Sequence, residues 1–155
     1  MAMTQNEMTA KTEDDAAAER FVAEFGAAWA AWDAAAFSKL WDPQGVLHTP
    51  VANAPVPADK HEAMIALEKQ MLPDFKWRAD HWARNGDVVF IAWTCTATIN
   101  ERKVEWSGTD IFVMRDGKIV EEVVHQDTLP LWAALDPSMA REPVIDVSSL
   151  EPVPA

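Results

Sequence analysis

A histidine and an aspartate stand two positions apart in the segment IVEEVVHQD, residues 119–127. Its β-branched residues predict a strand, and side chains two apart on a strand share one face. His125 and Asp127 would then lie side by side, on the face that carries Ile119. Burial raises the pKa of a carboxyl whereas a neighbouring imidazolium lowers it, and such an opposed pair suits general acid–base catalysis. We expect the two residues to form the polar floor of a pocket.

Each member of this pair also has a structural alternative. Asp127 precedes the segment TLPLWAAL, and its carboxylate could instead cap the helix predicted there. His125 could be a hydrogen-bonded histidine of the core or of an interface. Metal binding is a third use, because His48, His125 and Asp127 together offer two imidazoles and a carboxylate. The sequence has no H-E-x-x-H motif and no paired cysteines, and we expect no metal.

A further carboxyl lies in the segment VEWSGTDIFVM, residues 104–114, which also has the composition of a strand. If Phe112 points inward, Asp110 and Trp106 do as well, and the neighbouring strand would bring Asp110 near His125. A buried carboxylic acid that stays neutral can donate a hydrogen bond to a substrate oxyanion. The alternative is a structural aspartate whose carboxylate accepts hydrogen bonds from the backbone.

Other polar residues could join the same pocket. His48, in the segment GVLHTP, could point inward from the opposite wall or be a satisfied strand histidine. Asp33 could be a pocket carboxylate or the N-cap of a helix. His81 stands close to a predicted turn and could lie at the edge of the pocket or be exposed. His61, flanked by two charged residues on a predicted helix, is expected to face solvent.

The aromatic residues are unusual, because the chain has eight Trp, six Phe and no Tyr. Trp supplies a large, rigid, flat surface, which suits either a core or an aromatic-lined pocket. In a regular strand Trp77 and Trp82 would point to opposite faces, so one of them could contact a second copy of the chain. The candidates for substrate contact are Trp32, Trp41, Trp106, Phe112 and His81.

Composition bounds the class of protein. The 155 residues suit one domain, and the net charge of −12 argues against nucleic acid and anionic membranes as partners. Cys95 is the only cysteine, so a disulfide within the chain is impossible. The polar, acidic first 15 residues do not resemble a signal peptide, and no apolar run approaches a membrane span. We expect a cytoplasmic protein without a nucleotide cofactor, since the sequence lacks glycine-rich phosphate-binding motifs.

Hydrophobic spacing predicts the order of the elements. A long helix is expected at residues 16–32, preceded by a capping box of Thr12 and Asp15, and a third helix at 58–73 has a similar pattern at Asp59 and Glu62. A shorter helix, five strands and a closing helical turn are expected at 33–42, 45–51, 75–83, 88–99, 104–114, 119–127 and 128–135. This order predicts an α+β fold in which a curved antiparallel sheet wraps around three helices and forms a cone with an internal pocket.

The domain is expected to span residues 14–135. Residues 1–13 have the composition of a disordered lead, and residues 136–155 form a proline-rich tail.

The order of elements, together with the run WSGTDIFVMRDGKIVEEVVHQDTLPLWAAL, resembles the SnoaL-like branch of the nuclear-transport-factor-2-like superfamily. That group includes polyketide cyclases, ketosteroid isomerase and scytalone dehydratase, and the resemblance covers residues 19–135. It implies that Asp127, the aspartate before the final helix, is the acid–base residue. It also implies that Trp32 and Asp33 occupy the place of an aromatic–aspartate pair of scytalone dehydratase, in which the aromatic residue is a tyrosine. A homodimer is a further implication of the resemblance.

These expectations favour a cofactor-independent lyase or dehydratase that uses general acid–base catalysis. Its substrate would be a small hydroxylated aromatic or polycyclic compound held in an aromatic-lined pocket. The alternatives are an isomerase or polyketide cyclase on the same fold, and a non-catalytic dimeric module that binds a small molecule.

Overall fold

The first helix begins at the capping box that the sequence predicts. In the computed structural model, which describes residues 12–141, α1 spans Glu13–Ala31. The backbone N–H of Asp15 donates to Thr12 Oγ1 at 3.1 Å, and the N–H of Thr12 donates to the Asp15 carboxylate at 3.2 Å. Most of the predicted lead and of the proline-rich tail lies outside the described residues. Within the tail, Pro137–Met139 forms a short 3-10 helix.

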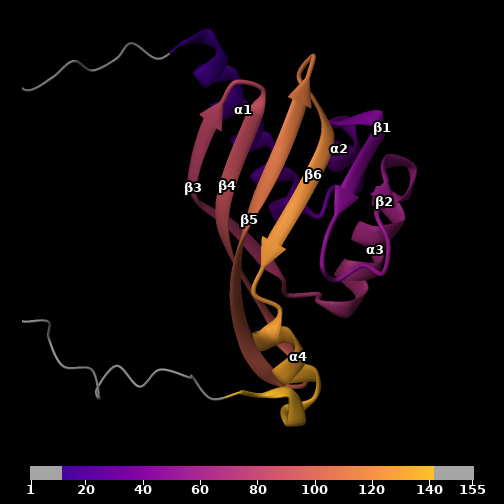
Figure 1. Cartoon of the computed structure of the whole chain (residues 1–155). Coiled ribbons are helices and arrows are strands. Elements are labelled where there is room, and N and C mark those ends of the chain that lie inside the picture. Colours follow the sequence, from indigo (N-terminus) through magenta and orange to yellow (C-terminus); the bar gives the residue numbers. More distant parts are fainter. Residues whose placement is uncertain (1–11, 142–155) are drawn as a thin grey trace, which may run out of the picture.

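A curved six-stranded sheet carries helices on its concave face, which confirms the predicted α+β class (Figure 1). The strand order is β2-β1-β6-β5-β4-β3, and β1 runs parallel to β6, whereas the other pairs among the described strands are antiparallel. The short β2 was not expected, because its proline-containing sequence reads as a loop. The elements are α2 (Ala34–Lys39), β1 (Trp41–His48), β2 (Val56–Pro57), α3 (His61–Met71), β3 (Lys76–Asn85), β4 (Val88–Ile99), β5 (Arg102–Arg115), β6 (Lys118–Gln126) and α4 (Leu129–Leu135).

Two of the three long hairpins close through tight turns with left-handed backbone at both central residues. Asn100 and Glu101 join β4 to β5 with φ of 48° and 64°, and Asp116 and Gly117 join β5 to β6 with φ of 51° and 73°. Positive φ at both central residues is typical of the turns that match the twist of antiparallel strands. The capping box predicted before α3 is wrong, since the N-cap is Lys60 and no side chain caps that helix.

A β-bulge in β6 decides which of its side chains point inward. Val113 pairs with Glu121 and Met114 pairs with Ile119, so Val120 is an extra residue on β6. Such an insertion exchanges the two faces of a strand for every residue beyond it. Ile119 is fully buried before the bulge, and Glu122 is buried after it.

A second bulge lies in β3. Ala79 pairs with Trp93 and His81 pairs with Ala92, so Asp80 is the extra residue. Trp77 and Trp82 consequently both pack against the core. The prediction that they face opposite sides is wrong, because it assumed a regular strand.

Helices cover the concave face and the end of the sheet (Figure 1). Phe21 and Phe25 of α1 meet Phe112 of β5 edge to face, with ring centroids 5.0 Å apart in both pairs. α4 closes the tip of the β4–β5 hairpin, where the Asn100 side chain donates to the Ala134 carbonyl oxygen at 3.2 Å. Among residues 12–141, no helix combines the length and apolar character that crossing a bilayer requires.

Candidate active site

An internal cavity of about 880 Å³ lies between the concave face of the sheet and the helices. Its wall is mostly aromatic and aliphatic, and the sheet contributes two carboxyl groups to it. A cavity of this size and character suits a small flat ligand. The aromatic residues that line it are Phe25, Trp29, Trp32, Phe37, Phe75, Trp77, Trp93, Trp106 and Trp132.

Asp110 of β5 and Glu122 of β6 are the two carboxyl groups on the sheet side of the cavity. They are 4% and 3% exposed. Asp110 pairs with Val124 and Glu122 pairs with Phe112, so the two residues are diagonal neighbours on adjacent strands. Within residues 12–141, neither Asp110 Oδ1 nor Glu122 Oε2 has a hydrogen-bond partner. Buried polar atoms without partners are costly, and their retention points to a functional role.

Burial shifts the acidity of both groups. It raises the pKa of Asp110 to about 7. It raises the pKa of Glu122 well above its ordinary value, and the neighbouring charge of Asp110 adds to the effect. Both shifts follow from the cost of placing a charge in an apolar cavity. The pair therefore joins a carboxyl whose pKa lies well above its ordinary value, Glu122, to one that ionises near pH 7, Asp110.

The indole of Trp93 is the neighbour that favours the ionised form of Asp110. Burial raises the pKa of Asp110, and the nearby indole N–H lowers it to a smaller extent, although Trp93 Nε1 makes no direct hydrogen bond within the described residues. Gly108, directly opposite Trp93 on β5, makes room for this ring. A Cβ at residue 108 would lie 2.5 Å from Trp93 Cζ2 and 2.6 Å from the His125 carbonyl oxygen. Because Gly108 has no side chain, the indole of Trp93 can lie against the sheet beside Asp110.

A third carboxyl group enters the cavity from the helical side. Glu68 of α3 is half-buried, and burial raises its pKa to about 7. Its charge also raises the pKa of Glu122. Cys95 of β4 lines the same cavity, and burial raises the pKa of its thiol well above the ordinary value. A thiol with this pKa stays protonated and unreactive at neutral pH.

The predicted substrate-contacting residues divide between the cavity and the core. Trp32 and Trp106 line the cavity, and the Trp106 indole N–H donates to Gln126 Oε1 at 3.1 Å. Phe112 is fully buried behind the lining, and Trp41 packs against the ring of His61 with centroids 4.1 Å apart. The prediction that Trp41 and Phe112 contact a ligand is therefore not met by their positions.

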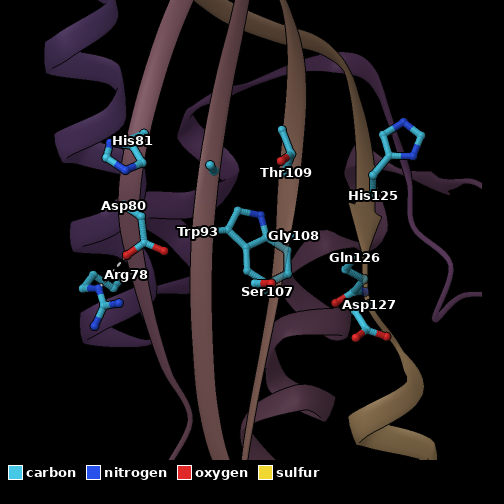
Figure 2. A pocket seen from close by; sticks show the side chains of 11 residues that line it. Arg78, Asp80, His81, Trp93, Ser107, Gly108, Thr109, His125, Gln126 and Asp127 are labelled. Carbon is cyan, nitrogen blue, oxygen red and sulfur yellow. Dashed lines mark hydrogen bonds and ion pairs between the residues drawn. The ribbon is translucent and has the colours of Figure 1, made fainter. Parts of the chain in front are cut away.

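His125 and Asp127 do not point into the cavity. Both line an open hollow on the outer face of the sheet, together with His81 and the ion pair of Arg78 with Asp80 (Figure 2). The predicted inward orientation is wrong because the bulge at Val120 exchanges the faces of β6. Asp127 instead accepts a hydrogen bond at 3.0 Å from the backbone N–H of Leu129, the first residue of α4, while the N-cap of that helix is Thr128.

Three other predicted positions are also corrected. His48 points outward, where its Nε2 lies 3.4 Å from Glu121 Oε1. Asp33 is exposed and accepts from the Ala36 N–H at 2.9 Å as the N-cap of α2, so it is not a cavity carboxylate. His61 is fully buried rather than solvent-facing, and its Nε2 lies 3.2 Å from the Val56 carbonyl oxygen.

The sequence patterns did not predict two of the carboxyl groups that line the cavity, Glu122 and Glu68. A regular strand with Ile119 pointing inward would place Glu121, rather than the adjacent Glu122, on the buried side. Glu68 looks like an ordinary charged residue of an amphipathic helix. Asp110 is the one residue of the predicted catalytic set that the structure places in the cavity. Within the described range of the chain, no group of three or more His, Cys, Asp or Glu side chains is arranged to hold a metal ion.

A family model described as the SnoaL-like domain matches residues 18–122. The chain belongs to the SnoaL-like domain family. The resemblance seen in its sequence is thereby confirmed. No curated protein matches the sequence.

Solved structures of similar proteins share the fold of this SnoaL-like protein. AclR, a candidate hydroxylase from Streptomyces galilaeus, is 23% identical with a TM-score of 0.68, over 79% of this chain and 97% of AclR. Wild-type IdmH, a candidate polyketide cyclase from Streptomyces antibioticus, is 20% identical with a TM-score of 0.68, over 76% and 97% of the two chains. A candidate SnoaL-like polyketide cyclase from Jannaschia sp. CCS1 is 16% identical with a TM-score of 0.66, over 85% and 97%.

Proposed function

We propose that this protein is a cofactor-independent enzyme that transfers protons within its aromatic cavity, and that its reaction is an elimination of the dehydratase or lyase type. The observation that carries the proposal is the pair of buried carboxyl groups of Asp110 and Glu122. Neither carboxyl is fully hydrogen-bonded among the described residues, and their acidities differ. Pairs of titratable groups whose environments separate their pKa values are typical of acid–base sites.

The two groups have distinct roles. Glu122 keeps its proton at neutral pH and acts as the general acid, whereas Asp110, with a pKa of about 7, is partly ionised and acts as the base. In an elimination, Asp110 removes the proton from the carbon next to the one that carries a hydroxyl group. The electron pair of the C–H bond forms the new double bond. The C–O bond breaks, and the proton of Glu122 completes the departing water molecule.

A second candidate reaction is an aldol-type cyclisation, which the family membership and the description of IdmH favour. The same residues suffice for it. Asp110 would remove a proton α to one carbonyl of the substrate, and the resulting carbanion would attack a second carbonyl carbon. Glu122 would protonate the alkoxide oxygen that forms there.

Turnover of a panel of hydroxylated aromatic and polycyclic compounds tests the proposal. The panel includes β-hydroxy carbonyl compounds for elimination and diketones for cyclisation, with a chelator present throughout. We expect Asp110→Asn and Glu122→Gln each to lower kcat by about a hundred- to ten-thousand-fold, as loss of one acid–base group does. Asp127→Asn and His125→Ala are the controls, because Asp127→Asn makes the same change as Asp110→Asn on the outer face and His125→Ala removes the other ionisable candidate there. We expect both controls to keep most of the activity.

The opposite pattern would overturn the proposal. If the outer-face variants lose turnover while Asp110→Asn and Glu122→Gln retain it, the chemistry takes place on the outer face of the sheet. If compounds bind in the cavity but none is converted, the protein is better described as a small-molecule-binding module.

A further inference from the structure

The cavity contains one carboxyl group more than the proposed reaction uses. Proton transfer needs Asp110 and Glu122, yet Glu68 of α3 adds a third carboxyl from the other side. Lys60, an exposed residue, is the only basic side chain among the described residues that line the cavity. Asp110 Oδ1 and Glu122 Oε2 are buried without partners in the described part of the chain, so they can accept hydrogen bonds from a ligand.

The wall around these carboxyls presents ring faces and edges. Trp29, Trp32 and Phe75 contact one another with centroids between 5.3 and 5.8 Å apart, and Phe75 also lies 5.8 Å from Trp106. Phe75 follows the carboxyl end of α3, the helix that carries Glu68. Aromatic rings attract cations through their quadrupole, and Trp does so best. Carboxylates and indole rings around one cavity are the combination that recognises an ammonium group.

We propose that the substrate of this site carries a protonated amino group, which binds between the Glu68 carboxylate and the Trp29–Trp32–Phe75 wall. This inference rests on the proposed function, because it assumes that the same cavity holds the substrate while Asp110 and Glu122 transfer protons. An anionic ligand is disfavoured, since Asp110 and Glu68 are partly ionised at pH 7 and no basic side chain of the described residues lies deep in the cavity.

Binding a cation also couples to proton release. The titratable groups that line the cavity are Asp110 of β5, Glu122 of β6, Glu68 of α3, Cys95 of β4 and, where α3 begins, Lys60. Burial raises the pKa of Glu68 and Asp110 to about 7, so both are partly protonated at pH 7. A bound ammonium group favours the carboxylate form and therefore expels protons to the solvent.

Calorimetric titration of three compounds of one shape tests the inference without any turnover. The probes are naphthalene-1-methylamine, a cation at pH 7, naphthalene-1-methanol, which is neutral, and 1-naphthoate, an anion. We expect the amine to bind at least about tenfold more tightly than the alcohol, and the naphthoate to bind most weakly. Titrations at pH 7 in phosphate and in Tris, whose heats of ionisation differ, should show proton release with the amine and none with the alcohol.

Glu68→Gln and Glu62→Gln form the matched pair of variants. Both lie on α3, but Glu62 is exposed and does not line the cavity. Glu68→Gln should reduce the preference for the amine by about fivefold or more while the alcohol binds as before, and Glu62→Gln should change neither. The inference is overturned if the alcohol binds as tightly as the amine, if the preference survives Glu68→Gln, or if none of the three probes binds at millimolar concentration.

Failure of this inference can be told apart from failure of the proposed function. If Asp110→Asn abolishes turnover of a neutral substrate and no amine preference exists, the catalytic proposal stands and the amine proposal falls. If the amine preference depends on Glu68 while turnover is indifferent to Asp110 and Glu122, the reverse holds.

Discussion

Asp110 and Glu122 are diagonal neighbours on the concave face of the sheet, because Asp110 pairs with Val124 on β6 and Glu122 pairs with Phe112 on β5. The carboxyl groups share an apolar cavity, and the charge of Asp110 disfavours the ionisation of Glu122. A protein that only needed a stable core would gain by replacing either group with an apolar side chain. The consequences of keeping both can be measured.

Glu122→Gln should stabilise the fold, increasingly so as the pH rises. The unfolded chain loses the Glu122 proton near the ordinary pKa of 4.5, whereas the folded state keeps it to a much higher pH. The folded state then binds more protons, so the free energy of unfolding falls as pH rises above about 4.5. We expect the variant to gain about 1–3 kcal/mol at pH 8 and little at pH 4. Urea denaturation at both pH values measures this.

Glu121→Gln is the control for that change. It replaces the adjacent glutamate, which is exposed on the outer face beside His48. An equal gain in the two variants would show that net charge, rather than burial of Glu122, causes the effect.

Trp93→Phe should raise the pKa of Asp110 further, because the indole N–H favours the carboxylate and phenylalanine has no such donor. The carboxyl ¹³C resonance of Asp110, followed against pH, reports this directly. Trp132→Phe removes a more exposed indole from the cavity rim and should leave the Asp110 titration as in the wild type. A titration of Asp110 that is identical in all three proteins would rule out the role given to Trp93.

Gly108→Ala should destabilise the protein by about 1–3 kcal/mol through overpacking. The added Cβ would lie 2.5 Å from Trp93 Cζ2 and 2.6 Å from the His125 carbonyl oxygen, so the indole must move. Thermal unfolding measures the loss, and a shift in Trp fluorescence reports the ring movement. Ser107→Ala, at the exposed neighbouring position, is the comparison. A fully stable Gly108→Ala protein would contradict the close packing described here.

His61 should make the fold sensitive to acid. Its ring is fully buried, and burial lowers the pKa of His61 below the ordinary value near 6.5. Below about pH 6.5 the unfolded chain binds a proton that the folded state does not. The free energy of unfolding therefore decreases as the pH is lowered. His61→Leu should lower stability at pH 8, through loss of the hydrogen bond to Val56, yet show a weaker decline between pH 7 and 5.

The matching substitution for that test is His81→Gln, which removes an exposed imidazole. It separates the effect of burial from the loss of a histidine as such. A decline with pH as steep in His61→Leu as in the wild type would contradict the assignment.

Local signals in the sequence were sufficient for most of the fold. Thr12 and Asp15 form the predicted capping box, and the β-branched run Val88–Ile99 is β4 as predicted. The inward position of Asp110 followed from Phe112 because β5 is regular between them. Each of these inferences needs only neighbouring residues or an uninterrupted strand.

The candidate site depended on features that local signals do not contain. The bulge at Val120 decides that Glu122, and not His125, faces the cavity, and it is defined by the pairing of β6 with β5. Asp33 and Asp127 each had a capping alternative, and both accept a backbone hydrogen bond at the start of a helix. The homodimer stays a prediction.

Titration of the wild-type carboxyl groups by ¹³C NMR tests the central claim most directly, with Asp110→Asn and Glu122→Gln used to assign the two resonances. The account predicts that Asp110 titrates near pH 7, that Glu122 titrates well above its ordinary range, and that the pKa of Glu122 falls when Asp110 is replaced by Asn. Titration of both groups near pH 4, independent of each other, would contradict it, because two ordinary carboxylates could not act as an acid and a base at neutral pH.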